Sequence, residues 1–213
     1  MKKYLLTLLA IVLSSLSYAQ GIQINGYSNY VFDDRVDSYY DPTSYYNGTI
    51  KGGFQWGAGI EYRANPYYGI EIMYLRQDTK APLNYYQGGV KYTNFDLAVS
   101  HIMLGGKRYF TPADSKVDGY GGLVVGANVM GLEDPDSGRS GSKTFFAWGA
   151  RLGADIWVTE KVAIKLQMQL ISSTQSVGGG LYFGTGGASA GLTSYSSIYQ
   201  FGMGGGLVLN LAK

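Results

Sequence analysis

The sequence predicts an all-β protein, an eight-stranded antiparallel up-and-down transmembrane β-barrel. Three observations predict it. Apolar and small or charged residues alternate with a period of two over eight segments, which is the repeat of a β-strand with two unlike faces. The connections between these segments are alternately long and short. The chain has 32 Gly and 20 Tyr, and no window after the first 20 residues approaches 18 consecutive apolar residues, so helical membrane spans are excluded.

The clearest alternation lies in a hairpin over residues 144–170. Its first arm places Phe146, Trp148 and Leu152 on one face, and Arg151 and glycines on the other. In a strand that faces water, glycine normally costs stability, but small residues beside charges suit a crowded interior. The uncharged face must then meet something apolar. We interpret the pattern as a membrane strand, with lipid outside and a polar lumen inside.

The other strands follow from the same pattern, and one of them is irregular. We expect strands at 22–32, 53–63, 67–76, 91–110, 119–130, 144–158, 162–170 and 198–211. In the fourth of these, Phe95, Leu97 and Val99 are predicted to face outward and Asp96 inward. The alternation then blurs over residues 101–106, where we expect a β-bulge.

The connections set the orientation. Short turns are expected at 64–66, 111–116 and 159–161, and longer polar loops at 33–49, 78–89, 133–143 and 178–196. This rhythm is typical of barrels in bacterial outer membranes, whose short turns face the periplasm and whose long loops face outward. The alternative, a soluble lipocalin-like barrel, would place the apolar face inside.

Residues 1–19 are predicted to be a cleaved secretory signal peptide, followed by a barrel domain over residues 20–213. Lys2 and Lys3 precede an apolar run, and Ala19 ends a small-residue cleavage site. The alternative is a membrane anchor, but the run is too short to span a bilayer. Without Lys2 and Lys3 the chain has 15 basic and 15 acidic residues, which gives no electrostatic case for nucleic-acid binding. The absence of cysteine excludes disulfides and thiolate metal sites.

Aromatic residues gather near both ends of the predicted strands. Such belts form where amphipathic rings lie at lipid headgroups; ordinary core aromatics are the alternative. The belt near the short turns consists of Tyr62, Tyr67, Tyr68, Tyr109, Phe110 and Trp157. The belt near the loops consists of Phe54, Trp56, Phe145, Phe146, Trp148, Tyr199 and Phe201.

With its signal peptide, eight alternating strands, three short turns and four polar loops, the chain resembles the small outer-membrane barrels of the outer membrane protein A (transmembrane part), X and W families. The resemblance covers nearly all of the chain after the signal peptide, and it concerns architecture more than motifs. One departure is the end of the chain, where Leu211, Ala212 and Lys213 replace the terminal aromatic residue common in these families. The resemblance implies a location in the outer membrane of the Gram-negative cell envelope.

The candidate functional residues are inward charges. They are Glu61, Arg63, Glu71, Asp96, Arg151, Asp155 and Lys165. An eight-stranded barrel is just filled by its side chains, so these charges are expected to pair. If a three-residue loop joins the sixth and seventh strands, Asp155 lies opposite Lys165. A structural ion-pair network that plugs the lumen is one interpretation, and a gated ion path is the other.

No catalytic, cofactor or metal site is expected. His101 is the one histidine, and its neighbour Ser100 points to the opposite face of the strand, so they cannot form a base and nucleophile pair. Barrel enzymes that deacylate lipid carry a His-x-Ser motif, which this order does not match. The carboxylates at 33, 34, 37 and 41 and at 133, 134 and 136 do not have the spacing of a calcium loop.

The predicted function is a structural or surface-interaction role in the outer membrane. Expected partners are membrane lipid and, through the loops, an extracellular protein or glycan. Exposed loop tyrosines favour such contact: Tyr39, Tyr40, Tyr45, Tyr46, Tyr85, Tyr86, Tyr182 and Tyr195. Contact with lipid headgroups explains the same tyrosines. The alternatives are a porin-like conduit for small, apolar solutes, supported by glycine-rich inner faces, and a lipid-modifying enzyme.

Overall fold

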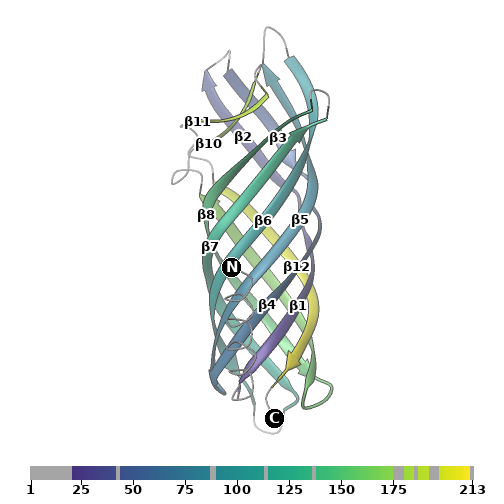
Figure 1. Ribbon diagram of the computed structural model, residues 1–213, viewed down its shortest axis with the longest axis vertical. Coiled ribbons are helices and arrows are strands. Elements are labelled where there is room, and N and C mark those ends of the chain that lie inside the picture. Colours follow the sequence, from purple (N-terminus) through teal and green to yellow (C-terminus); the bar gives the residue numbers. More distant parts are fainter. Residues whose placement is uncertain are drawn as a thin grey trace, which may run out of the picture.

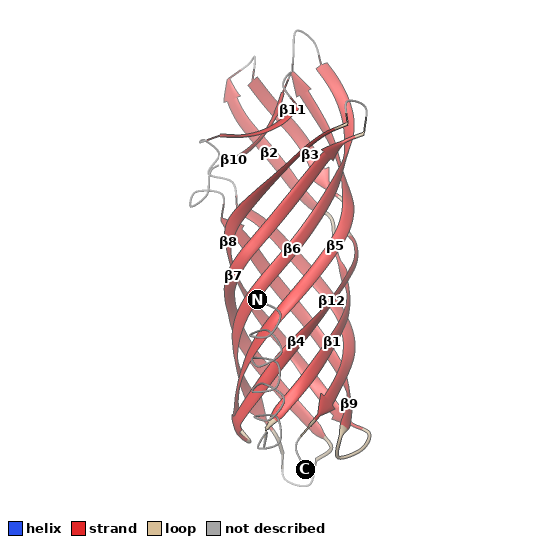
Figure 2. Ribbon diagram, viewed as in Figure 1, coloured by secondary structure: helices blue, strands red, loops and turns tan. Residues whose placement is uncertain are grey.

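The computed structural model describes residues 21–41, 44–86, 90–112, 115–135, 138–174, 180–184, 187–191 and 197–211. The predicted signal peptide lies outside these residues and stays a prediction. The described chain consists of strands and short connections (Figure 2). Within it there is no helix long and apolar enough to cross a bilayer.

The described residues form twelve strands. They are β1 (Ile22–Val31), β2 (Asp34–Asp41), β3 (Ser44–Ile50), β4 (Gly53–Asn65), β5 (Tyr68–Tyr86), β6 (Val90–Phe110), β7 (Val117–Asp134), β8 (Arg139–Trp157), β9 (Val162–Thr174), β10 (Gly180–Gly184), β11 (Gly187–Gly191) and β12 (Ser197–Asn210).

Eight of these strands close into an antiparallel barrel, which confirms the predicted fold class. Their order is β5-β4-β1-β12-β9-β8-β7-β6, and pairing between β5 and β6 closes the ring (Figure 1). The β2–β3 hairpin pairs with the far end of β5, and β10 and β11 form a separate two-stranded sheet. We call the end with the connections at 66–67, 111–116 and 158–161 the turn rim, and the other end the loop rim. Strand β1 begins at the turn rim, and β12 ends there.

The strands of one half of the barrel are longer than predicted. Strands β5, β6, β7 and β8 have 18 to 21 residues, whereas β1, β9 and β12 have 10 to 14. The predicted loops at 78–89 and 133–143 are therefore wrong over most of their length. The predicted loop at 33–49 coincides with the hairpin β2–β3, and the predicted loop at 178–196 contains the hairpin β10–β11. Figure 1 shows the four long strands continuing towards the loop rim beyond the ends of their neighbours.

The middle and turn-rim parts of the barrel have an apolar outer face and a polar interior. Ile60, Ile72, Leu104 and Leu152 are all more than half exposed, although none is polar. Gln23, Glu61 and Lys165 are buried on the inner face. A sheet with this inversion is stable where hydrocarbon surrounds it, and closure leaves no unpaired edge in the lipid. We therefore treat this band as the membrane-spanning part.

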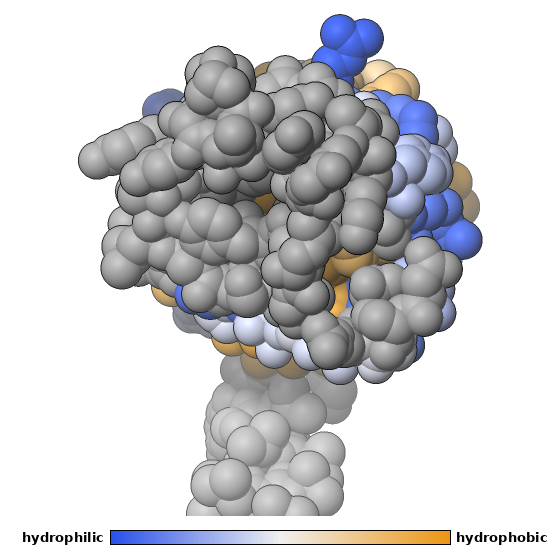
Figure 3. Space-filling view, turned by 90° about the horizontal axis from the view of Figure 1, so that it is seen from above, coloured by the Kyte–Doolittle hydropathy of each residue, from blue (hydrophilic) through white to orange (hydrophobic). Residues whose placement is uncertain are grey.

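Near the loop rim the pattern reverses, and here the prediction for β6 was wrong. Phe95, Leu97 and Val99 are buried inside, while Asp96 is exposed outside. No bulge occurs at 101–106, since the register of β6 with both neighbours runs through these residues without a shift. The physical reason is a change of solvent: a strand that leaves the bilayer meets water, and its apolar side chains then turn inward. Seen from the loop rim, hydrophilic side chains gather on one flank (blue at the right in Figure 3).

Candidate functional site

The interior of the membrane-spanning band holds a network of buried charges. Glu61 and Glu71 lie directly opposite each other in the β4–β5 register, an arrangement that is destabilising without cations. The ammonium of Lys107 lies between them, 2.7 Å from Glu61 Oε2 and 2.8 Å from Glu71 Oε2. Arg151 Nη1 lies 2.9 Å from the same Glu71 oxygen. All four side chains are at most 2% exposed, so water does not screen these pairs.

Neutral donors complete the coordination of the two glutamates. Asn25 Nδ2 donates to Glu61 at 3.0 Å and to Glu71 at 2.7 Å. The hydroxyl of Tyr27 donates to Glu71, and the hydroxyl of Tyr109 donates to Glu61. Each carboxylate therefore has both a cation and hydrogen-bond donors, which is what a buried charge needs to be retained.

A second ion pair lies beside this network. Asp155 and Lys165 are register partners in β8 and β9, and Lys165 Nζ lies 2.6 Å from Asp155 Oδ1. This confirms the predicted pairing across the turn at 159–161, where Val158 donates its N–H to Val162. The Lys165 ammonium also lies 4.5 Å from the centre of the Tyr120 ring. We call Glu61, Glu71, Lys107, Arg151, Asp155 and Lys165 the lumen cluster; its three cations balance its three carboxylates.

The turn rim carries a less buried pair. Arg63 Nη1 lies 2.9 Å from Asp118 Oδ2, and its guanidinium lies 3.8 Å from the centre of the Tyr109 ring. Asp118 also accepts hydrogen bonds from Trp157 Nε1 at 2.9 Å and from the Thr111 hydroxyl at 2.7 Å. This pair closes the polar interior on the side of the short turns.

Amide side chains continue from the lumen cluster towards the loop rim. Arg151 Nη2 donates to Gln167 Oε1 at 2.6 Å, and Gln167 Nε2 donates to Asn29 Oδ1 at 3.0 Å. Gln55 Oε1 accepts from Asn29 at 3.3 Å and from Gln169 at 2.7 Å. This amide ladder is a continuous polar wall along the strands β1, β4, β8 and β9.

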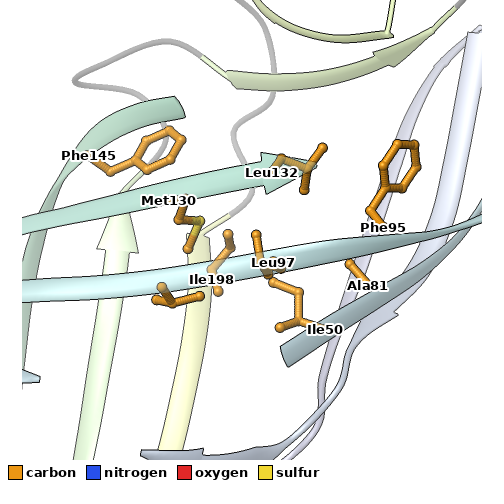
Figure 4. Packing of buried hydrophobic residues seen from close by; sticks show 9 residues of the cluster. Ile50, Ala81, Phe95, Leu97, Met130, Leu132, Phe145 and Ile198 are labelled. Carbon is orange, nitrogen blue, oxygen red and sulfur yellow. The ribbon is translucent and has the colours of Figure 1, made fainter. Parts of the chain in front are cut away.

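An apolar cluster fills the interior near the loop rim. It consists of Ile50, Ala81, Phe95, Leu97, Val99, Met130, Leu132, Phe145 and Ile198. Figure 4 shows these side chains meeting from several strands inside the barrel. Each is at most 6% exposed. The interior is therefore filled by charges at one level and by hydrocarbon at another.

The predicted lumen charges lie where expected with one exception. Glu61, Glu71, Arg151, Asp155 and Lys165 are buried inside, and Arg63 is partly buried at the turn rim. The prediction for Asp96 is wrong: this residue is exposed on the outer face, and its Oδ1 lies 3.8 Å from Lys80 Nζ. Its segment of β6 is beyond the lipid, where polar side chains face outward.

The prediction of a lipid-facing position is also wrong for two belt residues. Tyr109 is 1% exposed in the lumen, and Phe145 is 1% exposed in the apolar cluster. Trp157 is partly buried and bonded to Asp118. The remaining belt residues are 41% to 60% exposed: Tyr62, Tyr67, Tyr68, Phe110, Phe54, Trp56, Phe146, Trp148, Tyr199 and Phe201.

Sequence reasoning missed Lys107, the cation shared by both glutamates. Ile102, Leu104 and Phe110 share one parity on β6 and face outward. The opposite parity puts Lys107 inside, so strict alternation counted back from Phe110 would have found it. Tyr27 and Tyr120 were missed because tyrosine fits a lipid belt as well as a polar lumen.

His101 lies in the lumen and is fully buried. Neither ring nitrogen has a hydrogen-bond partner within the described residues. Ser100 has the opposite orientation, and its hydroxyl lies 3.3 Å from the Tyr74 hydroxyl. The two residues therefore do not form a catalytic pair with each other.

The loop carboxylates are separate from the lumen. Asp33 Oδ2 lies 3.1 Å from Lys51 Nζ, and Asp33 Oδ1 accepts the N–H of Gly52 at 2.8 Å. The hydrogen bond from Gly52 and then that from Lys51 hold the pKa of Asp33 below its usual range. Asp34 accepts the N–H of Tyr199 at 3.0 Å. Among the other predicted loop carboxylates, only the side chain of Glu133 lies in the described part, and it is exposed. The side chains of the eight loop tyrosines lie outside the described part.

Among known proteins, only solved structures match this chain. No family model matches the sequence, and no curated protein matches it. Among solved structures, Neisserial surface protein A is 13% identical, with a TM-score of 0.57 over 89% of this chain and 97% of that chain. The outer membrane protein OprG from Pseudomonas aeruginosa is 14% identical, with a TM-score of 0.56 over 90% of this chain and 96% of that chain.

These likenesses agree with the order of the strands, the closed sheet and the apolar outer face. At such low identity they establish the fold and leave the role open. The chain has the fold of the small eight-stranded barrels of bacterial outer membranes, and its lipid-compatible surface fits that location.

Proposed function

We propose that the protein is a closed, non-enzymatic outer-membrane barrel with a structural or surface-interaction role. The proposal rests on one observation: two separate groups of side chains fill the interior at two levels. The lumen cluster blocks the membrane-spanning band with paired charges, and the apolar cluster blocks the interior nearer the loop rim. A solute would have to break both.

The energetic cost of opening the lumen cluster is large. Glu71 contacts both Lys107 and Arg151, so separating the pairs leaves charges unpaired in a site that water does not reach. Breaking one buried ion pair costs about 3–5 kcal/mol. Thermal motion alone does not supply a continuously open path at that cost.

Glycine on the inner face supports the closed barrel as well. The sequence suggested that these glycines leave room for a solute. Their space is taken by neighbours: a Cβ at Gly204 would lie 2.8 Å from Asn29 Oδ1, and one at Gly122 would lie 3.2 Å from Lys107 Cγ. Glycine is needed there so that large side chains of the adjacent strand fit inside a narrow barrel.

A contact role draws on the part of the barrel beyond the lipid. Strands β5–β8 extend there with polar residues on the outside, among them Asp78, Lys80, Asp96 and Glu133. This rigid surface, together with the loops at the same rim, is suited to a protein or glycan partner outside the cell.

The second candidate is a conduit for small apolar solutes. The observation that favours it is the apolar interior at the loop rim, with Phe95, Leu97 and Leu132 facing the axis. An apolar solute could enter that region at little cost, but the lumen cluster would then stand in its way.

Reconstitution into planar bilayers separates the two candidates. The wild-type barrel is expected to give no conductance steps, and liposomes that contain it are expected not to take up small apolar solutes faster than empty liposomes. Arg151→Ala and Phe145→Ala, which each weaken one of the two blocks, are expected to remain silent because the other block persists. Defined steps or uptake through the wild-type protein would contradict the closed barrel and favour the conduit.

A further inference from the structure

Neutral polar side chains form a layer inside the barrel between the lumen cluster and the apolar cluster. Along β6 the inward residues change from Val99 of the apolar cluster to His101, and only farther on to Lys107 of the lumen cluster. The layer therefore lies at a level of its own, with hydrocarbon on one side and buried charges on the other. We call His101, Asn128, Ser173, Gln200 and Gln77 the polar layer.

The members of the polar layer follow one another around the barrel. His101 and Asn128 are register partners in β6 and β7, and Asn128 Nδ2 donates to the Ser173 hydroxyl at 2.6 Å. Gln200 is displaced by two residues from Ser173 in the register of β12 with β9, so both face the lumen. Gln200 Nε2 donates to Gln77 Oε1 at 3.2 Å. Gln77 is in turn displaced by two residues from His101 in the register of β5 with β6, which closes the circuit.

Several polar atoms of this layer have no partner, although their side chains are buried. His101 and Asn128 are fully buried, and Gln200 is 3% exposed. Both ring nitrogens of His101, Asn128 Oδ1 and Gln200 Oε1 have no hydrogen-bond partner within the described residues. The adjacent end of the amide ladder adds Gln55 Nε2 and Gln169 Oε1, which are likewise without a partner there. Donors and acceptors without partners therefore lie together at one level of the interior.

Such groups are rarely left without hydrogen bonds in a folded protein. On burial each of them loses its hydrogen bonds with water, and without a new partner it gains nothing in return. The large majority of buried polar side-chain atoms are bonded to protein or to ordered water. A neutral imidazole brings one N–H donor and one acceptor nitrogen, and both need a partner.

The chemistry of the unpartnered atoms favours water as that partner. The oxygens of Asn128, Gln200 and Gln169 accept hydrogen bonds, whereas Gln55 Nε2 donates one. A metal cation would suit the acceptors but not the amide N–H. A water molecule both donates and accepts, and buried water typically makes about three hydrogen bonds to groups of this kind.

We infer that the polar layer binds ordered water molecules, which bridge His101 to the amides of Asn128 and Gln200 and to the end of the amide ladder. Such water lies between the two clusters that fill the interior, so it exchanges slowly with bulk solvent. The carboxylates of the lumen cluster are not part of this site, since they have cations of their own. Water held in the polar layer does not open the barrel, because both clusters stay in place.

Nuclear magnetic resonance of His101 tests the inference. His101 is the one histidine of the chain, so isotope-labelled histidine, in protein without a histidine tag, isolates the signals of this imidazole. In detergent micelles, we expect its carbon-bound ring protons to show cross-peaks with the water resonance, with the sign of dipolar contact and not of chemical exchange. The internal control is Leu97, which is 3% exposed in the apolar cluster on the same strand. Its methyl protons are expected to show no cross-peak with water.

Two variants locate the water. Asn128→Leu removes one of the groups that bind it, and we expect the cross-peaks between His101 and water to be lost. The matched control is Ser100→Ala, which removes a hydroxyl from the residue next to His101 on the opposite face of β6. In Ser100→Ala the cross-peaks should be unchanged.

Three results would overturn the inference. The first is a wild-type spectrum in which the His101 ring protons contact protein protons only. The second is equal water cross-peaks at His101 and Leu97, which would mean that water enters the whole interior. The third is an unchanged cross-peak at His101 in folded Asn128→Leu. The comparison of His101 with Leu97 needs no substitution, so it decides even where Asn128→Leu does not fold.

Discussion

Replacing Glu71 with glutamine is expected to lower the free energy of unfolding by about 3–5 kcal/mol, the cost of leaving a buried ion pair without one partner. Glu71 is fully buried and lies within 2.9 Å of Arg151 and 2.8 Å of Lys107. Lys107 retains Glu61 after the change, whereas Arg151 has no second carboxylate among the ion pairs of the described residues. Urea unfolding in lipid vesicles measures the difference.

Two further variants test whether the loss of stability comes from the buried ion pair. Asp33→Asn removes a carboxylate whose partner Lys51 is half exposed, so the free energy of unfolding should stay unchanged. Adding Arg151→Met to Glu71→Gln should recover part of the loss, because the stranded cation is then gone. If Glu71→Gln were as stable as the wild type, the lumen cluster would not hold the barrel together as described.

Replacing Leu152 with arginine is expected to cost about 2–4 kcal/mol, the range for a charge on the lipid face near the bilayer centre. Leu152 is 57% exposed in the middle of the outward face of β8, between Ala150 and Ala154. Its neighbour Arg151 is tolerated because it faces the lumen and meets Glu71. The same vesicle assay gives the free energy.

The control for this change is Val158→Arg. Val158 is 61% exposed, as much as Leu152, but it lies in the connection at the turn rim, where an arginine side chain reaches the headgroups and water. It is expected to cost less than about 1 kcal/mol. Equal effects of the two arginines would mean that the outer face of β8 meets water along its whole length.

Much of the barrel could be predicted from alternation alone. In the arms of the β8–β9 hairpin, bulky apolar residues alternate with small or charged ones, and the tight connection fixes the register. The pairing of Asp155 with Lys165 followed from these two facts. Closure of the sheet followed from the count of segments and the rhythm of the connections.

What alternation could not provide was the solvent outside each part of a strand. Strand β6 keeps one parity from Phe95 to Tyr109, but lipid surrounds one part of its length and water the other. The inward residues are therefore apolar at Phe95 and Val99, and charged at Lys107. If lipid is assumed to surround the whole strand, this change of pattern looks like a β-bulge. The same assumption assigns Asp96 to the lumen, although it faces outward.

The same ambiguity affects aromatic residues near the rims. Tyr109 and Phe110 are adjacent, and both fit a headgroup belt by position and chemistry. Only Phe110 is exposed, because the Tyr109 hydroxyl has a buried acceptor in Glu61. That acceptor comes from β4, 48 residues away in sequence, and no local pattern identifies it.

The outer face of the membrane-spanning band meets hydrocarbon. Trp148 reports on it directly in a variant with Trp56→Phe and Trp157→Phe, which leaves one of the three tryptophans. Trp148 is 46% exposed on the outer face of β8. In lipid vesicles, its fluorescence should be quenched strongly by lipids brominated on their acyl chains and hardly by aqueous iodide. Strong quenching by iodide with none from the brominated lipids would contradict a membrane-spanning barrel.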